Sequence, residues 1–240
     1  MIGVNARRAN VGYSLSATRD IQEAAEWIST RRSPDAPQCA TTRPTQVDEQ
    51  TIRLLIEAAV QAPSAVNQQP WTFTVVRDQG VLDHISAKAK AHMLATMPAG
   101  PHSDHFQSLL DDPNFHIFYH APVLILISAA AEGPWIVEDC ALAAETLMLA
   151  AYAAGLGSCW LGFAQSFLST PDRKAALSLP AAWVPVAPII VGRPKAAPPR
   201  FRATRSRFVG LVKDGNCPTP PAPARPAWGR SMPPKMTEAI

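Results

Sequence analysis

The residues best suited to chemistry form a polar loop at positions 62–71, Ala-Pro-Ser-Ala-Val-Asn-Gln-Gln-Pro-Trp. Pro63 and Pro70 restrict the backbone at the two ends. Ser64 and Asn67 place a hydroxyl and an amide close together, and both groups can donate and accept hydrogen bonds. The pattern is typical of a loop that holds a small molecule. A plain connector between a helix and a strand is the structural alternative.

Arginines that could hold a phosphate occur in two places. The run Arg31-Arg32-Ser33 joins two guanidinium groups and a hydroxyl at the end of a helical pattern, and guanidinium groups offer fixed, charge-assisted donors. A solvated basic helix end would explain the same run through the helix dipole. The stretch 193–207 carries Arg200 and Arg202. A nucleic-acid surface is conceivable there, but the stretch has no recognisable motif and no interleaved aromatic residues.

Residues 155–162, Gly-Leu-Gly-Ser-Cys-Trp-Leu-Gly, form a glycine-bounded segment. By composition alone it is a strand or turn that follows a helix, with Gly155 as the C-terminal cap. Cys159 is interpreted as a small core residue rather than a nucleophile, because no nearby histidine or lysine in the sequence would activate its thiol.

Acidic residues and histidines give weaker signals. Glu138, Asp139 and Glu145 could include an acid–base pair, but Asp139 and Glu145 fall on different faces of one helix, so caps and partner contacts are favoured. The six histidines lack metal-ligand spacing. His102 and His105 could share a helical face, but no third ligand is near them, so no metal is predicted.

Composition restricts the class of protein. The chain has 240 residues, of which 47% are hydrophobic, and a formal net charge of +3. These values suit one globular domain and do not by themselves call for nucleic acid. No apolar run has the length of a membrane span, and the N-terminus does not resemble a signal peptide. The four cysteines are scattered without a Cys-x-x-Cys pair, which favours a reducing cytoplasm.

The hydrophobic periodicity predicts the elements that position these groups. Strands and helices alternate only in part, which favours an α+β sheet flanked by helices over a doubly wound fold. The segment 98–114 is predicted to be rich in loop, and the proline-rich stretch 218–234 an extended arm. Helices are predicted over residues 18–30, 47–62, 80–97, 135–154 and 171–179, and strands over residues 71–77, 122–130 and 183–191. The helix over 135–154 is apolar nearly all round, so it is predicted to be buried.

The loop at 62–71 resembles the Ala-Pro-Ser-x-x-Asn-x-Gln-Pro-Trp signature of the nitroreductase family, FMN-dependent NAD(P)H oxidoreductases. The other segments follow in the family's order: Arg-Arg-Ser before the loop, then an Ala-Pro strand, a long helix, Gly-Leu-Gly, and a glycine followed by a basic pair. The resemblance covers roughly residues 23–212. It implies the nitroreductase fold, with a mainly antiparallel central sheet, in an intertwined homodimer. The corresponding division is an N-terminal extension (1–17), an FMN-binding domain (18–213) and a proline-rich arm (214–240).

The resemblance also implies an FMN site. The Arg-Arg-Ser run and the basic pair would hold the phosphate, the loop would approach the flavin, and the Gly162 N–H would point at flavin N5, which accepts the hydride. Asp35 departs from the family, which commonly has a basic residue there near flavin N1 and O2; either Arg43 or another cation replaces it, or the flavin potential is shifted. The implied cofactor-binding residues are Arg31, Arg32, Ser33, Pro63, Ser64, Ala65, Asn67, Cys159, Trp160, Leu161, Gly162, Arg200 and Arg202.

The implied activity is ping-pong hydride transfer from NADPH or NADH to a flat, electron-poor acceptor such as a nitroaromatic or a quinone. No protein residue is implied as catalytic, because the flavin carries the hydride. Phe106, Phe115 and Phe118 could stack on the acceptor, although each is more often a core residue. Three alternatives stay open. One is another flavin reaction on the same fold, namely an enoate-type or dehalogenating reductase, an azoline oxidase or flavin cleavage. The second is a non-catalytic FMN-binding or storage protein, and the third and weakest is nucleic-acid binding.

Overall fold

A computed structural model describes residues 42, 45–97 and 103–195 of the chain. All of them belong to one compact unit within residues 1–201. The predicted helix over 18–30, both predicted extensions, Arg31, Arg32, Ser33, Asp35, Arg200 and Arg202 lie outside the described residues. The predicted division into domains stays a prediction.

The centre of the fold is a sheet of four strands: β1 (Trp71–Val76), β2 (Val123–Ala129), β3 (Gly157–Trp160) and β4 (Val184–Gly192). Their order is β1-β2-β4-β3, and each neighbouring pair is antiparallel. The expected α+β class and antiparallel sheet are therefore confirmed. β1 and β3 form the two edges, so the segments next to them in the sequence lie at opposite sides of the sheet.

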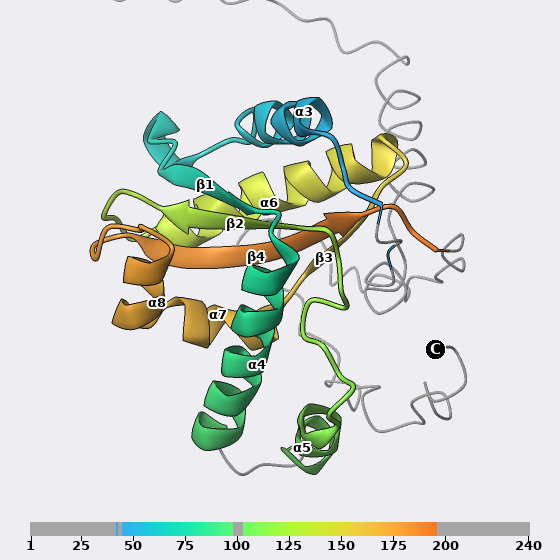
Figure 1. The fold of residues 1–240 in the computed structure, drawn as a ribbon. Helices are drawn as coiled ribbons and strands as arrows, with labels where there is room; N and C mark the ends of the chain where they lie inside the picture. Colours follow the sequence, from blue (N-terminus) through green and yellow to red (C-terminus); the bar gives the residue numbers. More distant parts are fainter. Residues whose placement is uncertain (1–41, 43–44, 98–102, 196–240) are drawn as a thin grey trace, which may run out of the picture. The chain divides into compact units, whose positions relative to one another are not determined.

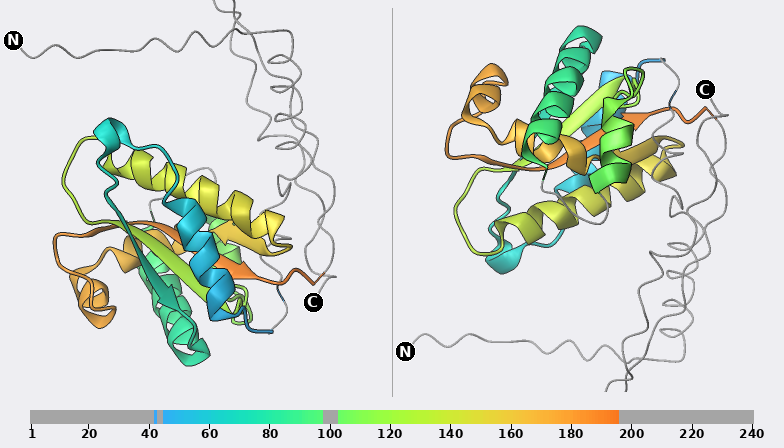
Figure 2. Two further views of the ribbon diagram at one scale, coloured as in Figure 1. Left: turned by 90° about the horizontal axis from the view of Figure 1, so that it is seen from above. Right: turned by 90° about the horizontal axis from the view of Figure 1, so that it is seen from below.

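Helices cover both faces of the sheet, as Figures 1 and 2 show. α3 (Glu49–Ala59) and α6 (Ile136–Ala153) pack on one face, and α4 (Gln79–Thr96) and α7 (Gly162–Leu168) on the other. β2 is buried on both sides, because its alternate side chains enter the two cores. Ile125 and Ile127 enter the core with α3 and α6, and Leu124 and Leu126 enter the core with α4 and α7.

Local signals set the helix ends. The Asp48 carboxylate accepts a hydrogen bond from the Thr51 N–H at 2.8 Å and begins α3. The Asp78 carboxylate does the same for α4 through the Val81 N–H at 2.9 Å. Each acid also faces the positive end of its helix dipole. Gly155 follows α6 with a φ of +72°, as a glycine cap does. Beyond α7, the short helix α8 (Pro171–Ala176) begins directly after Thr170.

Two sequence expectations need correction. The segment predicted as loop contains α5 (Ser103–Asp111), because Phe106, Leu109 and Leu110 recur at helical spacing and bury Leu110. In addition, α6 is not buried all round in this chain. One side packs against α3 and the sheet, but Val137 and Leu142 on the other side are 49% and 45% exposed. Within the described part of the chain, no helix has both the length and the hydrophobicity needed to cross a membrane.

The end of β4 is closed by an isolated antiparallel bridge between Thr42 and Pro194. A β-carbon added at Gly192 would lie 2.6 Å from the Thr42 Cβ and 2.9 Å from the Pro122 Cδ. Gly192→Ala is therefore expected to lower the free energy of unfolding by about 1–3 kcal/mol, as overpacking does. Urea unfolding checks this against Gly80→Ala, whose new methyl group would meet only an Asp78 oxygen at 3.3 Å. Equal stability of the two variants would show that Thr42 and Pro122 move aside for the new methyl group at no cost in free energy.

Candidate functional site

The loop before β1, residues 63–69, has a strained backbone. Val66, Asn67 and Gln69 have φ angles of 46°, 57° and 49°, in the left-handed region that residues with a β-carbon seldom adopt. Such residues cost on the order of 1–3 kcal/mol each and persist only where their surroundings hold them. η1 (Ala65–Asn67) is the short 3-10 turn within this loop.

Hydrogen bonds inside the loop fix its shape. The Ser64 Oγ accepts from the Gln69 N–H at 3.0 Å, and the Gln69 amide donates to the Asn67 Oδ1 at 2.8 Å. Gln69 thus has a structural role within the loop. These bonds leave the Ser64 hydroxyl proton and the Asn67 Nδ2 without a partner among the described residues. The loop consequently presents two hydrogen-bond donors to a ligand.

Contacts from the segment before α6 and from its first turn hold the 63–69 loop in place. The Gln68 amide donates to the Glu132 carbonyl oxygen at 3.2 Å. The Ala65 N–H donates to the Asp139 Oδ1 at 2.8 Å, and Asp139 is only 3% exposed. The sequence does not identify Asp139 as a contact of this loop. Its spacing from the buried residues Ala143 and Leu147 was the available signal, because residues four apart share a helix face.

The second candidate segment is the turn from β3 into α7. Cys159 and Leu161 are buried and face the core with α4 and α7, whereas Trp160 packs toward α3 and α6. The Leu161 N–H donates a hydrogen bond to the Pro188 carbonyl oxygen at 2.8 Å. Gly162 is exposed, and a β-carbon placed there would meet no atom within 4 Å. A flat molecule can therefore approach the backbone at Gly162 closely, whereas the Cys159 and Leu161 side chains are buried in the core.

The chain does not bring these two segments together. The 63–69 loop precedes the edge strand β1, and Gly162 follows the opposite edge strand β3 (Figure 1). Two strands lie between these edges, which is roughly 14 Å of sheet at the usual strand spacing. The Thr42–Pro194 bridge, by contrast, joins the two chain segments that lead toward the predicted phosphate-binding arginines.

The three phenylalanines predicted to contact an acceptor have different environments. Phe118 is 0% exposed in the core with α4 and α7, so it cannot stack on a bound molecule and that prediction needs correction. Phe106 is 39% exposed, and its ring contacts Phe163 edge to face at 5.6 Å. Phe115 also meets Phe163, at 6.4 Å. Phe106 and Phe115 thus keep partial access to solvent around Phe163.

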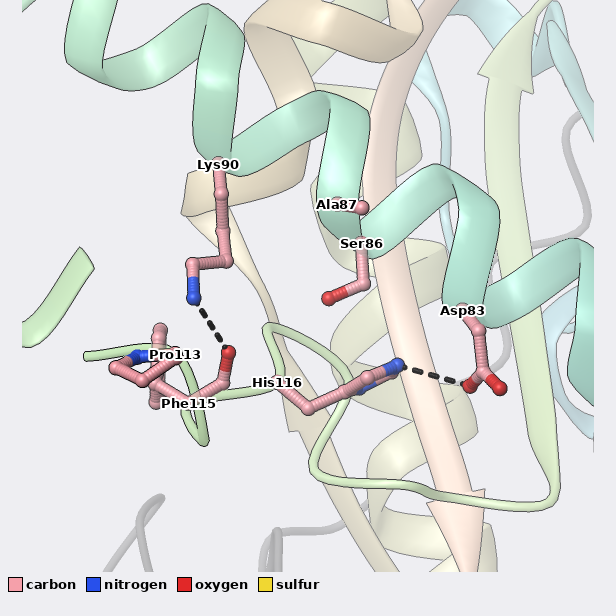
Figure 3. Close-up of a pocket in the computed structure, with 7 residues that line it drawn as sticks. All are labelled: Asp83, Ser86, Ala87, Lys90, Pro113, Phe115 and His116. Atoms are coloured by element: carbon pink, nitrogen blue, oxygen red, sulfur yellow. Dashed lines mark hydrogen bonds and ion pairs between the residues drawn. The ribbon is translucent and has the colours of Figure 1, made fainter. Parts of the chain in front are cut away.

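A shallow pocket of about 260 Å³ lies between α4 and the loop before β2 (Figure 3). Its polar groups are used to hold that loop. The Lys90 Nζ donates to the carbonyl oxygens of Asp112 and Phe115 at 2.7 and 2.9 Å, and the Ser86 Oγ accepts from the Ile117 N–H at 2.9 Å. This pocket is therefore a structural clamp rather than a reaction site.

Two of the residues that line this pocket, Asp83 and His116, form a cluster with His120, and their candidate ligand atoms lie within 4.8 Å of one another. The His116 Nδ1 accepts from the backbone N–H groups of Phe118 at 3.1 Å and His120 at 3.4 Å, and its Nε2 contacts the Asp83 Oδ1 at 3.1 Å. The proton of the neutral ring therefore lies on Nε2. A metal at Nε2 would require that proton on Nδ1, against two N–H groups, so the geometry disfavours metal binding.

The environment of His116 predicts a pH dependence of stability. Burial and the neighbouring His120 lower the pKa of His116 below its usual 6.5, and Asp83 only partly opposes them. The unfolded chain then binds the proton more readily, so stability falls as the pH drops below about 6.5 and until the lower folded pKa is passed. Urea unfolding between pH 7.5 and 5.5 should show a smaller loss for His116→Asn than for the native chain. His84→Asn, at an exposed position on α4, is the control, and an equal loss in all three proteins would contradict the assignment.

A sequence model described as the nitroreductase family matches residues 41–193, more than half of the chain. This chain belongs to the nitroreductase family. The resemblance drawn from the sequence, and the oxidoreductase class that it implied, are thus confirmed.

Individual relatives agree with the family. A protein of Archaeoglobus fulgidus named "putative NADH dehydrogenase/NAD(P)H nitroreductase" is 30% identical over 176 residues, which are 73% of this chain and 87% of the relative. The 5,6-dimethylbenzimidazole synthase of Rhodospirillum rubrum is 29% identical over 168 residues, which are 64% and 75% of the two chains. The crystal structure of a Bacteroides fragilis nitroreductase with bound FMN superimposes with a TM-score of 0.66 at 22% identity, over 80% of this chain and 99% of that one.

Proposed function

We propose that this nitroreductase-family protein is an FMN-dependent NAD(P)H oxidoreductase that reduces nitroaromatic or quinone-like acceptors. The observation that carries the proposal is the strained 63–69 loop, which presents the Ser64 hydroxyl and the Asn67 amide as donors. The acceptor atoms of an isoalloxazine ring and a ribityl chain suit such donors. The exposed backbone at Gly162, where a β-carbon would meet no atom within 4 Å, also supports the binding of a flat ring.

The described residues would bind and orient rather than react. Ser64 and Asn67 would donate to the cofactor, Ala65 would leave room for it, and the Gly162 N–H would face the ring. When bound, FMN supplies the hydride chemistry. NADPH or NADH and then the acceptor would occupy the same place in turn, which is a ping-pong order. Arg31, Arg32, Ser33, Arg200 and Arg202 are proposed for the phosphate on the resemblance, and a cytoplasmic location stays a prediction.

A homodimer follows from the same proposal. The loop and Gly162 lie at opposite edges of one sheet, so a second copy is the direct way to place both around one cofactor. Val137 and Leu142, on the exposed side of α6, would be available to the second copy. Trp135, just before the helix, is also exposed, at 55%.

The deciding experiment is an anaerobic visible spectrum of the purified protein, taken before and after NADPH or NADH and then after a nitroarene. Flavin bands that bleach with the nicotinamide and return with the nitroarene would establish the proposed reductase. Bands that do not bleach would favour FMN storage or another flavin reaction. The absence of bands even after FMN is added would refute the FMN site.

The Rhodospirillum rubrum relative favours a second candidate, the formation of 5,6-dimethylbenzimidazole. Aerobic incubation with FMN and NADPH, followed by chromatography against authentic 5,6-dimethylbenzimidazole, separates the two activities. Appearance of this product, without multiple turnover of a nitroarene, would replace the reductase by the synthase.

A further inference from the structure

Asp139 is a buried acid whose position core packing does not explain. It is 3% exposed, in a helix side that otherwise buries alanine, cysteine and leucine. Its Oδ1 accepts the Ala65 N–H at 2.8 Å. Its Oδ2 is buried and has no hydrogen-bond partner among the described residues. Burial of such a group is costly unless its contacts compensate, so the contact with the loop has to account for it.

The contact reaches the loop where its strain begins. Ala65 is followed directly by Val66 and Asn67, both in the left-handed region. Among the described residues, the only other hydrogen bond between this loop and the segment 130–139 is the longer one from the exposed Gln68 to the Glu132 carbonyl oxygen, at 3.2 Å. Asp139 therefore provides the buried anchor of the strained turn, from a residue 74 positions away in the sequence.

We propose that Asp139 is a positioning residue that holds the 63–69 loop in its ligand-binding conformation through the Ala65 N–H. It thereby determines where Ser64 and Asn67 present their donors. The identity of the ligand rests on the proposed function, whereas the effect on the loop does not. The Ala65 carbonyl oxygen accepts a hydrogen bond from the Gln68 N–H at 3.0 Å. The Ala65 N–H is thus committed to Asp139 and does not serve a ligand, to which Ala65 offers its small side chain.

The test compares two matched pairs of variants in the full-length protein. Asp139→Leu removes the acceptor and Asp139→Asn keeps an acceptor oxygen without the charge. Glu138→Leu and Glu138→Gln make similar changes at the exposed neighbour on the same helix turn. Two quantities are measured for each: amide hydrogen exchange of the peptide containing residues 63–69 in the flavin-free protein, and the FMN dissociation constant by quenching of flavin fluorescence.

The proposal requires that Asp139→Leu raise both the exchange rate of the loop and the FMN dissociation constant about tenfold, the effect of losing a hydrogen bond to a charged group. Exchange in β2 should stay unchanged, Asp139→Asn should stay within about threefold of the native protein, and both Glu138 variants should match it. The proposal would be overturned if the loop of Asp139→Leu exchanged at the native rate. It would also be overturned if Asp139→Asn changed the exchange rate and the FMN dissociation constant as much as Asp139→Leu, or if exchange in β2 rose as well.

Two further provisions cover a variant that does not fold and a protein that does not bind FMN. If Asp139→Leu does not fold, Asp139→Glu, which displaces the carboxylate by one methylene, is measured instead and is held to the same expectation for the loop. If the native protein binds no FMN, the proposed function fails. The exchange measurement then still decides whether Asp139 holds the loop.

Discussion

Replacing Arg200 and Arg202 together by alanine is expected to weaken FMN binding about a hundredfold, because each guanidinium removed takes charge-assisted hydrogen bonds from the phosphate. Both residues lie outside the described part of the chain, so the prediction rests on the family resemblance and on the Thr42–Pro194 bridge, which fixes where their segment leaves the sheet. The dissociation constant is measured by fluorescence quenching in moderate salt, since salt screens exposed charges.

The control for this prediction is the replacement of Arg205 and Arg207 by alanine, which removes the same charge from the same basic stretch. These two arginines are interpreted as surface charges, so their loss should change the dissociation constant only slightly. Full flavin occupancy in the Arg200/Arg202 variant would show that the phosphate is held elsewhere. Equal weakening in both variants would indicate a general effect of charge rather than a phosphate site.

Phe118→Ala is expected to lower the free energy of unfolding by about 3–5 kcal/mol, the usual cost of removing a fully buried phenylalanine. Phe118 is 0% exposed and lies in the core with Leu124 and Leu126 of β2. The loss combines the transfer of the ring to water with the cavity that remains. Urea unfolding measures it, with Phe106→Ala, at a ring 39% exposed, as the comparison.

The same pair of variants separates a core residue from a substrate contact. Phe106→Ala should cost about 1 kcal/mol or less, as is usual away from the core, and can alter the KM for the acceptor. Phe118→Ala should act through stability alone. Native stability in Phe118→Ala, together with a raised KM, would reinstate Phe118 as an acceptor contact.

Much of the fold follows from local pattern. β2 is a continuous apolar run, and α3 and α4 begin at aspartates that cap them, so these elements could be predicted within a few residues. α5 could not be predicted, because its short helical pattern lies among prolines, polar residues and histidines, which favour a loop. Only the burial of Leu110 in the tertiary structure shows that the segment is a helix. The burial of α6 was predicted too broadly, because an apolar helix face does not say whether this chain or a second one covers it.

By itself, the sequence determined the family, the class of fold and the loop that carries Ser64 and Asn67, because these depend on residue types at fixed local spacing. Only the tertiary structure decided which residues lie close together in space and which are buried. It put the 63–69 loop and Gly162 at opposite edges of the sheet, buried Phe118 in the core and joined Asp139 to Ala65. The physical reason is that such contacts depend on strand order and helix packing, which connect residues far apart in the chain and leave no local pattern.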